Sequence, residues 1–585
     1  MILAAATWAL ALAGQSDVGP LGGERLVAVE DRSTRALELV LLDAGVISPL
    51  TFGPYPARRA AHLVDRLAAG DVDVPIAFDH ALEVVKGPVD LTDAERAALL
   101  FNVRSFALLS DGRGTLQLSP QLGLELYGRG TPVGEGPAWD REFKDRQPPA
   151  ALDIQAAWHV IDGVTAWGRM TLDITQDPNL FRQAGRPAQQ TNIMPLDGID
   201  WSFPHRATVA VGGEGYSVSV GRDRLSLGEG RMGNMMLGDS ADFHDHARLQ
   251  LDTAFPVGSF TFTSLLIRLD PSLTTEELAL PGMDVLVAQQ KHLVLHRADV
   301  VFFDKLRLAV SEAWLAGGVP LDLRHLNPLL VFHNLFAWND TPPYDSASIM
   351  VGLEASVVPV RGVKLWGQYA VNQIQFPLEE LWYGEAATTI PNADGALGGV
   401  ELTAPLRLFE PRDVPWTKLT GVAHLYAGVE AAGTSAWFGV REHPLITWTA
   451  RRRVPSNLPG GQDLFDQPIG WRDGPDSQAW RVWLGALDVG FGHVEVAYEE
   501  RVRGEQRFTT PYEVSAEAAA LSTPTGTPER ARVVIVQAEV LPLRFERFSG
   551  RLRVDYRRFF VDAFNHERGR TVVDDQLVLT ANIGL

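Results

Sequence analysis

The chain has 585 residues, of which 46% are hydrophobic and 21% charged, so collagen, a coiled coil and bulk disorder are excluded. Acidic residues outnumber basic ones by 72 to 52, giving a formal net charge of −20, and a nucleic-acid partner is therefore not expected. The chain contains no cysteine, which excludes disulfides, thiolate metal sites and cysteine nucleophiles. This composition suits an exported protein that folds without oxidation.

The first residues have the pattern of a secretory signal. Residues 2–13 (ILAAATWALALA) form a short apolar run that ends in small residues, although no Lys or Arg lies between Met1 and the run. We predict a signal peptide over residues 1–16, with a buried N-terminal helix as the alternative. No later stretch approaches the ~18 uninterrupted apolar residues of a membrane helix. A β-barrel stays compatible with the sequence, because its signal is alternation rather than bulk hydrophobicity.

Helical periodicity follows the signal, within residues 17–112. Apolar residues at spacings of three and four predict helices over 56–70 and 92–107, and a shorter helix over 79–86. Thr92 and Glu95 form a capping box ahead of the second helix. Since these helices total too few residues for a large domain, we expect a small bundle packed against something bigger.

From about residue 115 the period changes from 3.6 to 2. Leu116 and Leu118 begin an apolar–polar alternation that recurs along the chain, and Leu552 and Val554 still alternate with Arg553 near the C-terminus. This pattern predicts an all-β region over residues 113–585. Loops are expected at 175–200, 271–290, 377–395, 452–476 and 510–528, which are rich in Pro, Gly, Asp or Thr.

Alternation alone fits a soluble sandwich or propeller as well as a membrane barrel. Arginine-dense strand faces suit a wet lumen, and no fixed repeat supports a propeller. Aromatic residues in strand runs suit interface girdles, namely Trp366, Tyr369, Trp480 and Trp483. We therefore predict an antiparallel transmembrane β-barrel of roughly 16 to 20 strands, most plausibly 18, preceded by the small helical bundle.

Two segments carry a resemblance to a known family. The first spans residues 216–243, and the second spans 291–334 and is followed by strands around 363–376. The chain resembles the Wzi-like capsule-assembly family of outer-membrane proteins, although it has Leu227-Gly228-Glu229-Gly230 where that family has a Trp-Gly-Pro-Gly-type turn. The family-motif positions here are Gly221, Arg222, Gly228, Glu229, Gly230, Ser311, Glu312, Asn327 and Pro328.

The resemblance implies an outer-membrane barrel with a periplasmic N-terminal helical region. It implies a protein that binds surface polysaccharide like a lectin and anchors it, without catalysis, cofactor or metal. Its implied partners are the polysaccharide, outer-membrane lipid and the polysaccharide export machinery.

One polar row is the best candidate for sugar binding. Amide groups pair with hydroxyls, and aromatic faces pack on sugar C–H surfaces. The alternative is an ordinary lumen wall beside a girdle. The row consists of Trp366, Gln368, Tyr369, Asn372, Gln373 and Gln375.

Other clusters support weaker hypotheses. Glu312 has the parity of the apolar residues Leu308 and Val310, so we expect either a bulge or a carboxylate at the edge of the membrane zone that pairs with an arginine such as Arg324. Sugar binding by Glu312 is the alternative to this structural pairing. An outer-membrane hydrolase could use one of four histidines, but no G-x-S-x-G motif supports it. The histidines are His292, His296, His325 and His333.

A cluster of acids and imidazoles at the end of the first recognised segment could hold a divalent cation. Its spacing matches neither an EF-hand nor a zinc helix, so a polar loop is the preferred interpretation. The cluster is Asp239, Asp242, His244, Asp245 and His246. Among membrane functions, a sugar or oligosaccharide channel is the alternative to the lectin, because the same lumen could conduct instead of holding a glycan.

Overall fold

A computed structural model gives the structure of the chain. It describes residues 26–27, 32–56, 59, 63, 109–110, 114–131, 135, 137, 150–161, 164–173, 189–191, 204, 206–241, 243–280, 290–321, 327, 347–373, 389–408, 412–414, 417–419, 422–455, 462–488, 491–510, 512–545 and 548–584. The predicted signal peptide lies outside these residues, as do the predicted helices over 79–86 and 92–107 and nearly all of the one over 56–70.

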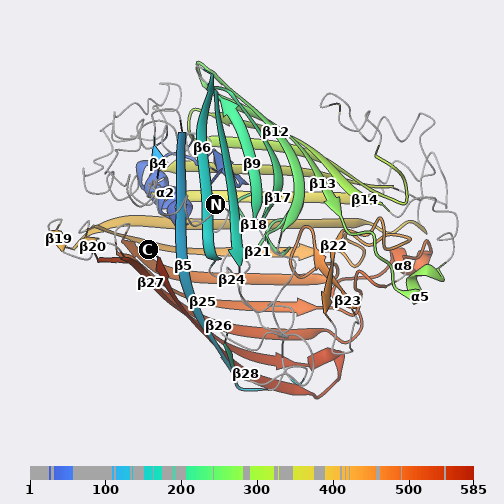
Figure 1. Cartoon of the computed structure of the whole chain (residues 1–585). Coiled ribbons are helices and arrows are strands. Elements are labelled where there is room, and N and C mark those ends of the chain that lie inside the picture. The colour runs from blue at the N-terminus through green and yellow to red at the C-terminus, as the bar shows by residue number, and fades with distance from the viewer. Residues whose placement is uncertain are drawn as a thin grey trace.

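Eighteen long strands among the described residues form one closed antiparallel barrel, which β28 completes by pairing with β5 (Figure 1). The barrel and its strand number agree with the prediction from sequence. In order around the barrel the strands are β5 (Gly114–Arg129), β6 (Ala150–Ile161), β7 (Val164–Asp173), β9 (Ala207–Gly213), β10 (Tyr216–Asp223), β12 (His244–Phe255), β13 (Gly258–Leu269), β14 (Lys291–Phe302), β15 (Leu306–Gly317), β16 (Ala347–Val360), β17 (Val363–Gln373), β18 (Ala393–Arg407), β21 (Val422–Thr434), β24 (Ser477–Asp488), β25 (Gly492–Arg503), β26 (Glu529–Phe545), β27 (Phe548–Asp562) and β28 (Thr571–Gly584).

Shorter elements decorate this wall. Among them, β22 and β23 form a hairpin within the stretch 452–476, where the sequence analysis expected an irregular loop. The short elements are β1 (Leu26–Val27), β2 (Phe52–Gly53), β3 (Tyr55–Pro56), β4 (Leu109–Ser110), β8 (Gln189–Thr191), β11 (Ser226–Leu227), β19 (Arg412–Val414), β20 (Thr417–Leu419), β22 (Thr449–Pro455), β23 (Gln462–Pro468), α5 (Thr275–Leu278), α8 (Ala516–Ala519) and the 3-10 turn η10 (Phe564–His566).

Alternating side chains divide each wall strand into an inner and an outer face. On β24, Arg481 and Trp483 point inward and are buried, whereas Val482 and Leu484 point outward and are exposed. Exposed aliphatic side chains recur on the outer faces of most wall strands. Exposing this apolar surface to water would be unfavourable, whereas contact with lipid would not be. The exposed set includes Val209, Val220, Leu308, Val310, Leu353, Leu365, Leu402, Leu425, Val482, Leu484, Val494, Val496, Leu552, Leu577 and Ile583.

The two ends of the barrel differ in the length of their connections. At one end, turns such as those at residues 255–258, 302–306 and 360–363 join neighbouring strands directly. At the other end, the chain makes long excursions, for example between β21 and β24 and between β25 and β26. We call these the short-turn end and the long-loop end.

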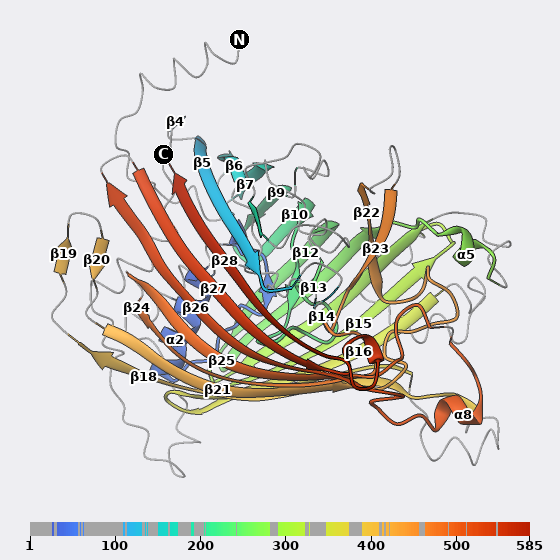
Figure 2. The same cartoon turned by 90° about the horizontal axis from the view of Figure 1, so that it is seen from below.

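A helix that the sequence analysis missed lies inside the barrel. Helix α2 (Arg32–Ala44) contacts β17, β18 and β21, and Figure 2 shows it among the curved wall strands. Most residues of its segment LELVLLDA are apolar, and Leu39 and Leu41 are buried. The Nη2 of Arg35 donates to both oxygens of Glu401 on β18 at 2.8 Å.

The chain after α2 continues through the lumen to meet a second internal segment. Strand β2 pairs with β11, which belongs to the segment 224–241 that leaves the wall after β10. This segment, which we call the lumen loop, also bonds to the long-loop end, where Gly238 N donates to Ile469 O at 2.7 Å. One buried core therefore runs through the lumen, and it includes Leu39, Leu41, Met232, Met235, Met236, Trp448, Ile469 and Trp471.

Candidate functional site in the lumen and at the long-loop end

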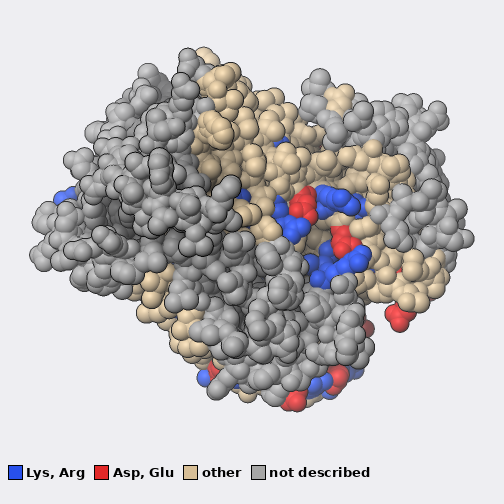
Figure 3. All heavy atoms as spheres, in the orientation of Figure 1, with Lys and Arg blue, Asp and Glu red and all other residues tan. Residues whose placement is uncertain are grey.

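A row of buried ion pairs lines the inner wall of β14, β15 and β16. Arg297 bonds to Glu354 at 2.6 Å, and Arg307 bonds to Asp299 at 2.9 Å and to Glu354 at 3.0 Å. All four side chains are buried, and each guanidinium faces both carboxylates of the row, Asp299 and Glu354. Figure 3 shows basic and acidic side chains gathered in a hollow of the molecule, while the described wall around them is almost free of charge.

The family-motif residue Glu229 joins the lumen loop to this row. Its carboxylate pairs with Arg307 at 3.1 Å and with Lys364 on β17 at 2.8 Å. Burial by itself would raise the pKa of Glu229, but Lys364 and Arg307 outweigh that effect and hold the pKa below its ordinary value of 4.5. The neighbouring Gly228 has φ of +121°, and a Cβ there would lie 2.2 Å from Gln368 Nε2, so only glycine fits.

The predicted sugar-binding residue Gln368 is bound to the lumen loop. Its Nε2 donates to Asn234 Oδ1 at 2.7 Å, and its Oε1 accepts from Met235 N at 3.0 Å. Asn234 Oδ1 also accepts from Gly230 N at 2.9 Å. A Cβ at Gly230 would lie 1.8 Å from Gly233 O, which explains the second glycine of the turn. Gln368 thus uses both ends of its amide inside the protein.

Trp366 is held in the same way through a buried acid. Its Nε1 donates to Glu430 on β21 at 2.8 Å, and the same carboxylate accepts the backbone N–H groups of Arg231 and Met232. Glu430 is completely buried. The carboxylate therefore joins three elements, which are the wall strands β17 and β21 and the lumen loop.

The remaining members of the predicted row are divided between the two faces of the wall. Asn372 points inward, where it donates to Ser348 Oγ at 3.0 Å, whereas Tyr369 and Gln373 have the outward parity of β17. Gln375 lies outside the described residues. The row is therefore not one surface, and polysaccharide binding by these residues stays a prediction.

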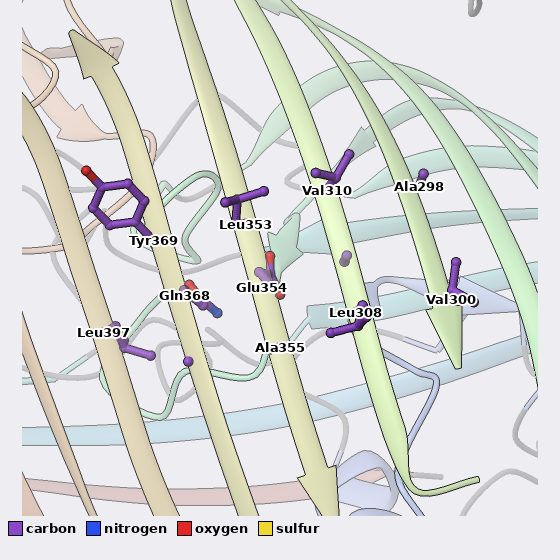
Figure 4. A pocket seen from close by; sticks show the side chains of 12 residues that line it. Ala298, Val300, Leu308, Val310, Leu353, Glu354, Ala355, Gln368, Tyr369 and Leu397 are labelled. Carbon is purple, nitrogen blue, oxygen red and sulfur yellow. The ribbon is translucent and has the colours of Figure 1, made fainter. Parts of the chain in front are cut away.

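Tyr369 borders a depression of about 630 Å³ on the outer wall (Figure 4). The outward-facing part of this depression is apolar, with Val310 and Leu353 on the adjoining strands. The Tyr369 hydroxyl donates to Asp394 at 3.2 Å. This residue belongs to the membrane-facing surface rather than to a lumen site.

The predicted girdle is correct for half of its aromatic residues. Trp480 points outward and its ring lies 5.2 Å from that of Tyr498 on β25. Trp366 and Trp483 instead point inward and are buried, 6.4 Å apart, so their assignment to a girdle was wrong. The inward rings occupy the space left by glycines on the neighbouring wall strands, as the ring of Trp366 does at Gly399.

An aromatic cluster at the long-loop end adjoins Asn372. Arg441 donates to the carbonyl oxygen of Asn372 at 2.7 Å, and its guanidinium lies 5.9 Å from the centre of the Tyr512 ring. Tyr512 contacts the edge of Trp437 at 5.4 Å, and burial raises the pKa of Tyr512. Phe508 packs nearby against the glycines of the same loops.

We call Arg441, Phe508 and Tyr512, with the buried Trp437 beneath them, the loop platform. The first three are half-buried and so present part of their surface to solvent. Two of them are aromatic and one is a planar cation with several hydrogen-bond donors. The sequence analysis missed these residues, because 510–528 was seen only as a loop; the closely spaced aromatics Phe508 and Tyr512 were the available signal.

The proposed metal cluster does not converge. His244 and His246 point inward on β12, whereas Asp245 points outward and pairs with Arg222 at 2.7 Å. Asp239 lies in the lumen loop, and Asp242 lies outside the described residues. Within the part of the chain that the structure describes, no three acidic or imidazole side chains form a cation site.

The structure excludes one of the two hypotheses for Glu312, the β-bulge, and leaves the other a prediction. Pairing is continuous through Glu312, which lies opposite His296 on β14 and Val351 on β16, so the bulge was wrong. Arg324 lies outside the described residues, and so do His325 and His333. His292 also has outward parity, with its ring 5.1 Å from that of Trp314.

Two of the other family-motif residues, Gly221 and Ser311, have contacts within the barrel that explain them. Gly221 has φ of +142°, and a Cβ there would lie 2.1 Å from Ala207 O, so glycine is required where β9 and β10 meet. Ser311 Oγ accepts a hydrogen bond of 3.0 Å from Arg297 in the ion-pair row. Asn327 is exposed, and Pro328 lies outside the described residues.

The closed antiparallel wall, its apolar outer face and its charged lumen define the fold of an outer-membrane β-barrel protein. No helix among the described residues is long and apolar enough to cross a membrane.

Comparison with solved structures agrees with this class. The chain is similar to Wzi of Escherichia coli, described as an outer membrane protein involved in group 1 capsule assembly and a carbohydrate binding β-barrel. The two share 13% identity over 95% of this chain and 98% of Wzi, with a TM-score of 0.52, which is a likeness of fold.

Two further solved structures are less similar to the chain. OprD of Pseudomonas aeruginosa is 10% identical over 82% of this chain and 99% of its own, with a TM-score of 0.34. An anion-selective porin of Comamonas acidovorans is 10% identical over 81% and 100%, with a TM-score of 0.33. No protein-family model matches the chain. No curated protein is similar to it in sequence.

Proposed function

We propose that the protein resides in the outer membrane, belongs with the Wzi-like proteins, and binds and anchors a surface polysaccharide without catalysing a reaction. The observation that carries the proposal is the filled lumen. Helix α2 and the lumen loop are bonded to the wall by Arg35–Glu401, Glu229–Arg307 and Glu229–Lys364. A barrel blocked in this way suits holding a ligand at its surface better than conducting one.

The loop platform is the proposed glycan contact. In outer-membrane barrels the long loops face outward from the cell, so Arg441, Phe508 and Tyr512 would meet a surface polymer. Half-buried aromatic rings supply flat apolar faces for sugar C–H groups, and the guanidinium donates to hydroxyl or carboxylate oxygens. The likeness in fold to Wzi, a carbohydrate binding barrel, supports this assignment.

The first experiment is surface-polysaccharide retention in a deletion strain of the producing bacterium. Cell-attached and shed glycan are measured while total synthesis is monitored. Complementation with the wild-type gene should restore attached glycan, whereas the double variant Tyr512→Ala/Arg441→Gln should leave it shed. Tyr216→Ala, at the short-turn end, is the matched control and should restore attachment.

The possible outcomes test the anchoring role and the loop platform separately. Unchanged attached and shed fractions in the deletion strain would refute anchoring. A double variant that restores attachment fully would refute the loop platform while leaving anchoring in place. Outer-membrane levels of each variant are compared by immunoblot, so that loss of protein is not mistaken for loss of binding.

A sugar or oligosaccharide channel is the second candidate. The observation in its favour is the charged inner wall, where Arg297, Arg307 and Arg481 are buried among acids, since a polar lumen is typical of porins. Planar-bilayer recording separates the two functions. Steady conductance of the wild-type protein would support the channel, and its absence together with shed glycan in the deletion strain would support the anchor.

A further inference from the structure

Three arginines project from the outer face of the barrel near the long-loop end of two neighbouring strands. They are Arg530 and Arg532 on β26 and Arg558 on β27, with side chains 56%, 43% and 47% exposed. Val533 and Phe559, the residues that directly follow Arg532 and Arg558, are buried on the inner face. We call these three residues the outer arginine belt.

The belt lies where the apolar band of the outer wall ends. Arg532 pairs across the sheet with Glu500, while Tyr498, two residues along β25, pairs with Val534. Beyond Tyr498, the outer face of β25 continues with the exposed Val496. The belt thus begins one step beyond the aromatic pair Trp480–Tyr498, at the level where membrane aromatics meet lipid headgroups.

The same order of side chains is found on the outer faces of β27 and β28. Arg558 is followed along the outer face of β27 by Tyr556 and then by the exposed Leu552, and it pairs with Asp575 on β28. The outer face of β28 continues with the exposed Leu577. Arginine, aromatic and aliphatic side chains therefore form successive layers down this wall.

Two of the three acids that pair with the belt, Asp562 and Asp575, are exposed, and the third, Glu500, is half-buried but pairs with an exposed arginine. Arg558 Nε lies 3.8 Å from Asp575 Oδ1, and that oxygen already accepts the Tyr556 hydroxyl at 2.6 Å. Arg530 Nε lies 3.3 Å from Glu500. Arg532 bonds to Asp562 at 2.6 Å, but both side chains are more than 40% exposed. Exposed pairs of this kind contribute little and exchange readily for a stronger ligand.

Phosphate is the ligand that this geometry favours. Guanidinium groups bind phosphate through two parallel N–H donors, which is stronger and more directional than an exposed contact to a single carboxylate oxygen. The three arginines and the acids Glu500, Asp562 and Asp575 carry no net charge together, so recognition depends on local bonds rather than on a long-range field. The ligand must also have an apolar body, because the wall beside the belt is aliphatic.

We propose that the outer arginine belt binds the phosphate groups of a phosphorylated glycolipid in the outer leaflet, with its acyl chains against the apolar band of β25 to β28. This inference depends on the membrane location and not on polysaccharide binding. Glycan retention and lipid binding can therefore fail independently of each other.

The test uses the full-length barrel in nanodiscs, with lipid release followed by native mass spectrometry. Two forms of one glycolipid are compared, diphosphorylated and enzymatically dephosphorylated, in a background of zwitterionic phospholipid. The wild-type protein should retain the diphosphorylated form on the order of tenfold better. Arg530→Gln/Arg532→Gln/Arg558→Gln should remove that preference, and the corresponding triple lysine variant should keep part of it.

Controls address charge, folding and a different partner. Arg407→Gln/Arg453→Gln/Arg568→Gln removes three exposed arginines elsewhere and should keep the wild-type preference. Folding is checked by the heat-dependent gel mobility of barrels, with Arg558→Gln alone as the milder variant. Equal retention of both glycolipids by the wild type, or an unchanged preference in the triple glutamine variant, would overturn the proposal. A change of oligomeric mass without a change in lipid preference would also overturn it, and would indicate a protein contact.

Discussion

Trp366 Nε1 donates a 2.8 Å hydrogen bond to Glu430, and the same buried carboxylate receives the backbone N–H groups of Arg231 and Met232. One acid thus joins two wall strands to the lumen loop. Because the carboxylate has no exposure to water, every donor that it satisfies would be left unpaired by its removal.

Glu430→Ala should therefore destabilise the barrel strongly. The buried indole and two backbone donors lose a charged acceptor, and the expected cost is about 3 to 5 kcal/mol. Denaturant unfolding in detergent measures it. Glu442→Ala, at an exposed position, is the control and should change the free energy of unfolding by less than about 0.5 kcal/mol. Equal effects of the two substitutions would contradict the assignment.

Acid should loosen the lumen loop through Glu229. Its folded-state pKa lies below the ordinary value of 4.5, because Lys364 and Arg307 outweigh the effect of burial. The stabilisation is therefore complete above pH 4.5 and is lost as the pH falls through the lower folded-state pKa. Bilayer conductance should rise in that acid range for the wild type.

The variant Glu229→Gln isolates this effect. It should conduct more than the wild type at neutral pH, and it should lack the acid-induced step, because its side chain does not titrate. The control Glu214→Gln changes an exposed acid in the turn between β9 and β10. A wild-type conductance that does not rise on acidification well below pH 4.5 would count against the role of Glu229 in holding the lumen loop to the wall.

Gly399→Ala should disturb the inner wall. A Cβ at Gly399 would lie 2.4 Å from Cζ2 of Trp366, so the indole must move or the strands must separate. Overpacking of this kind costs about 1 to 3 kcal/mol. A changed tryptophan fluorescence spectrum and a lower unfolding midpoint are the expected readouts.

Gly128→Ala is the matched control for that substitution. It lies on another wall strand, and no atom lies within 4 Å of its added Cβ. We expect a change within about 0.5 kcal/mol and an unaltered spectrum. If both alanine variants behave alike, the close packing of Trp366 on the wall is not the reason for glycine at position 399.

Arg451→Gln should free the β22–β23 hairpin. Arg451 pairs with Glu277 on α5 at 2.6 Å and with Asp466 on β23 at 2.7 Å. The pKa of Glu277 is accordingly held below its ordinary value despite burial. Losing both pairs should raise the rate of protease cleavage in the hairpin several-fold, which limited proteolysis of intact cells detects. Arg453→Gln, whose side chain is 54% exposed, should leave the rate unchanged.

The inward and outward faces of the strands could be predicted from the sequence, because alternation is a local property. Arg553 and Leu552 lie on opposite faces in the structure as their parity predicted, and the last strand has Leu577 outward and Gln576 inward. Helix α2 was not predicted, because a short, mostly apolar segment such as LELVLL does not by itself distinguish a buried helix from a strand. Parity also could not tell which aromatics face lipid, because Trp366 and Trp480 both follow alternating runs.

The candidate site depended on contacts between residues distant in sequence. The amino-acid sequence alone determined the period of the wall and its approximate strand number, and it singled out Gly228, Glu229, Trp366 and Gln368 as candidates without indicating their partners. The tertiary structure decided what these residues touch. Glu229 meets Arg307 and Lys364 only because the lumen loop folds back into the closed barrel. Alternation specifies the face on which a side chain lies, whereas its partner is set by closure of the sheet around α2 and the loop, which no local pattern encodes.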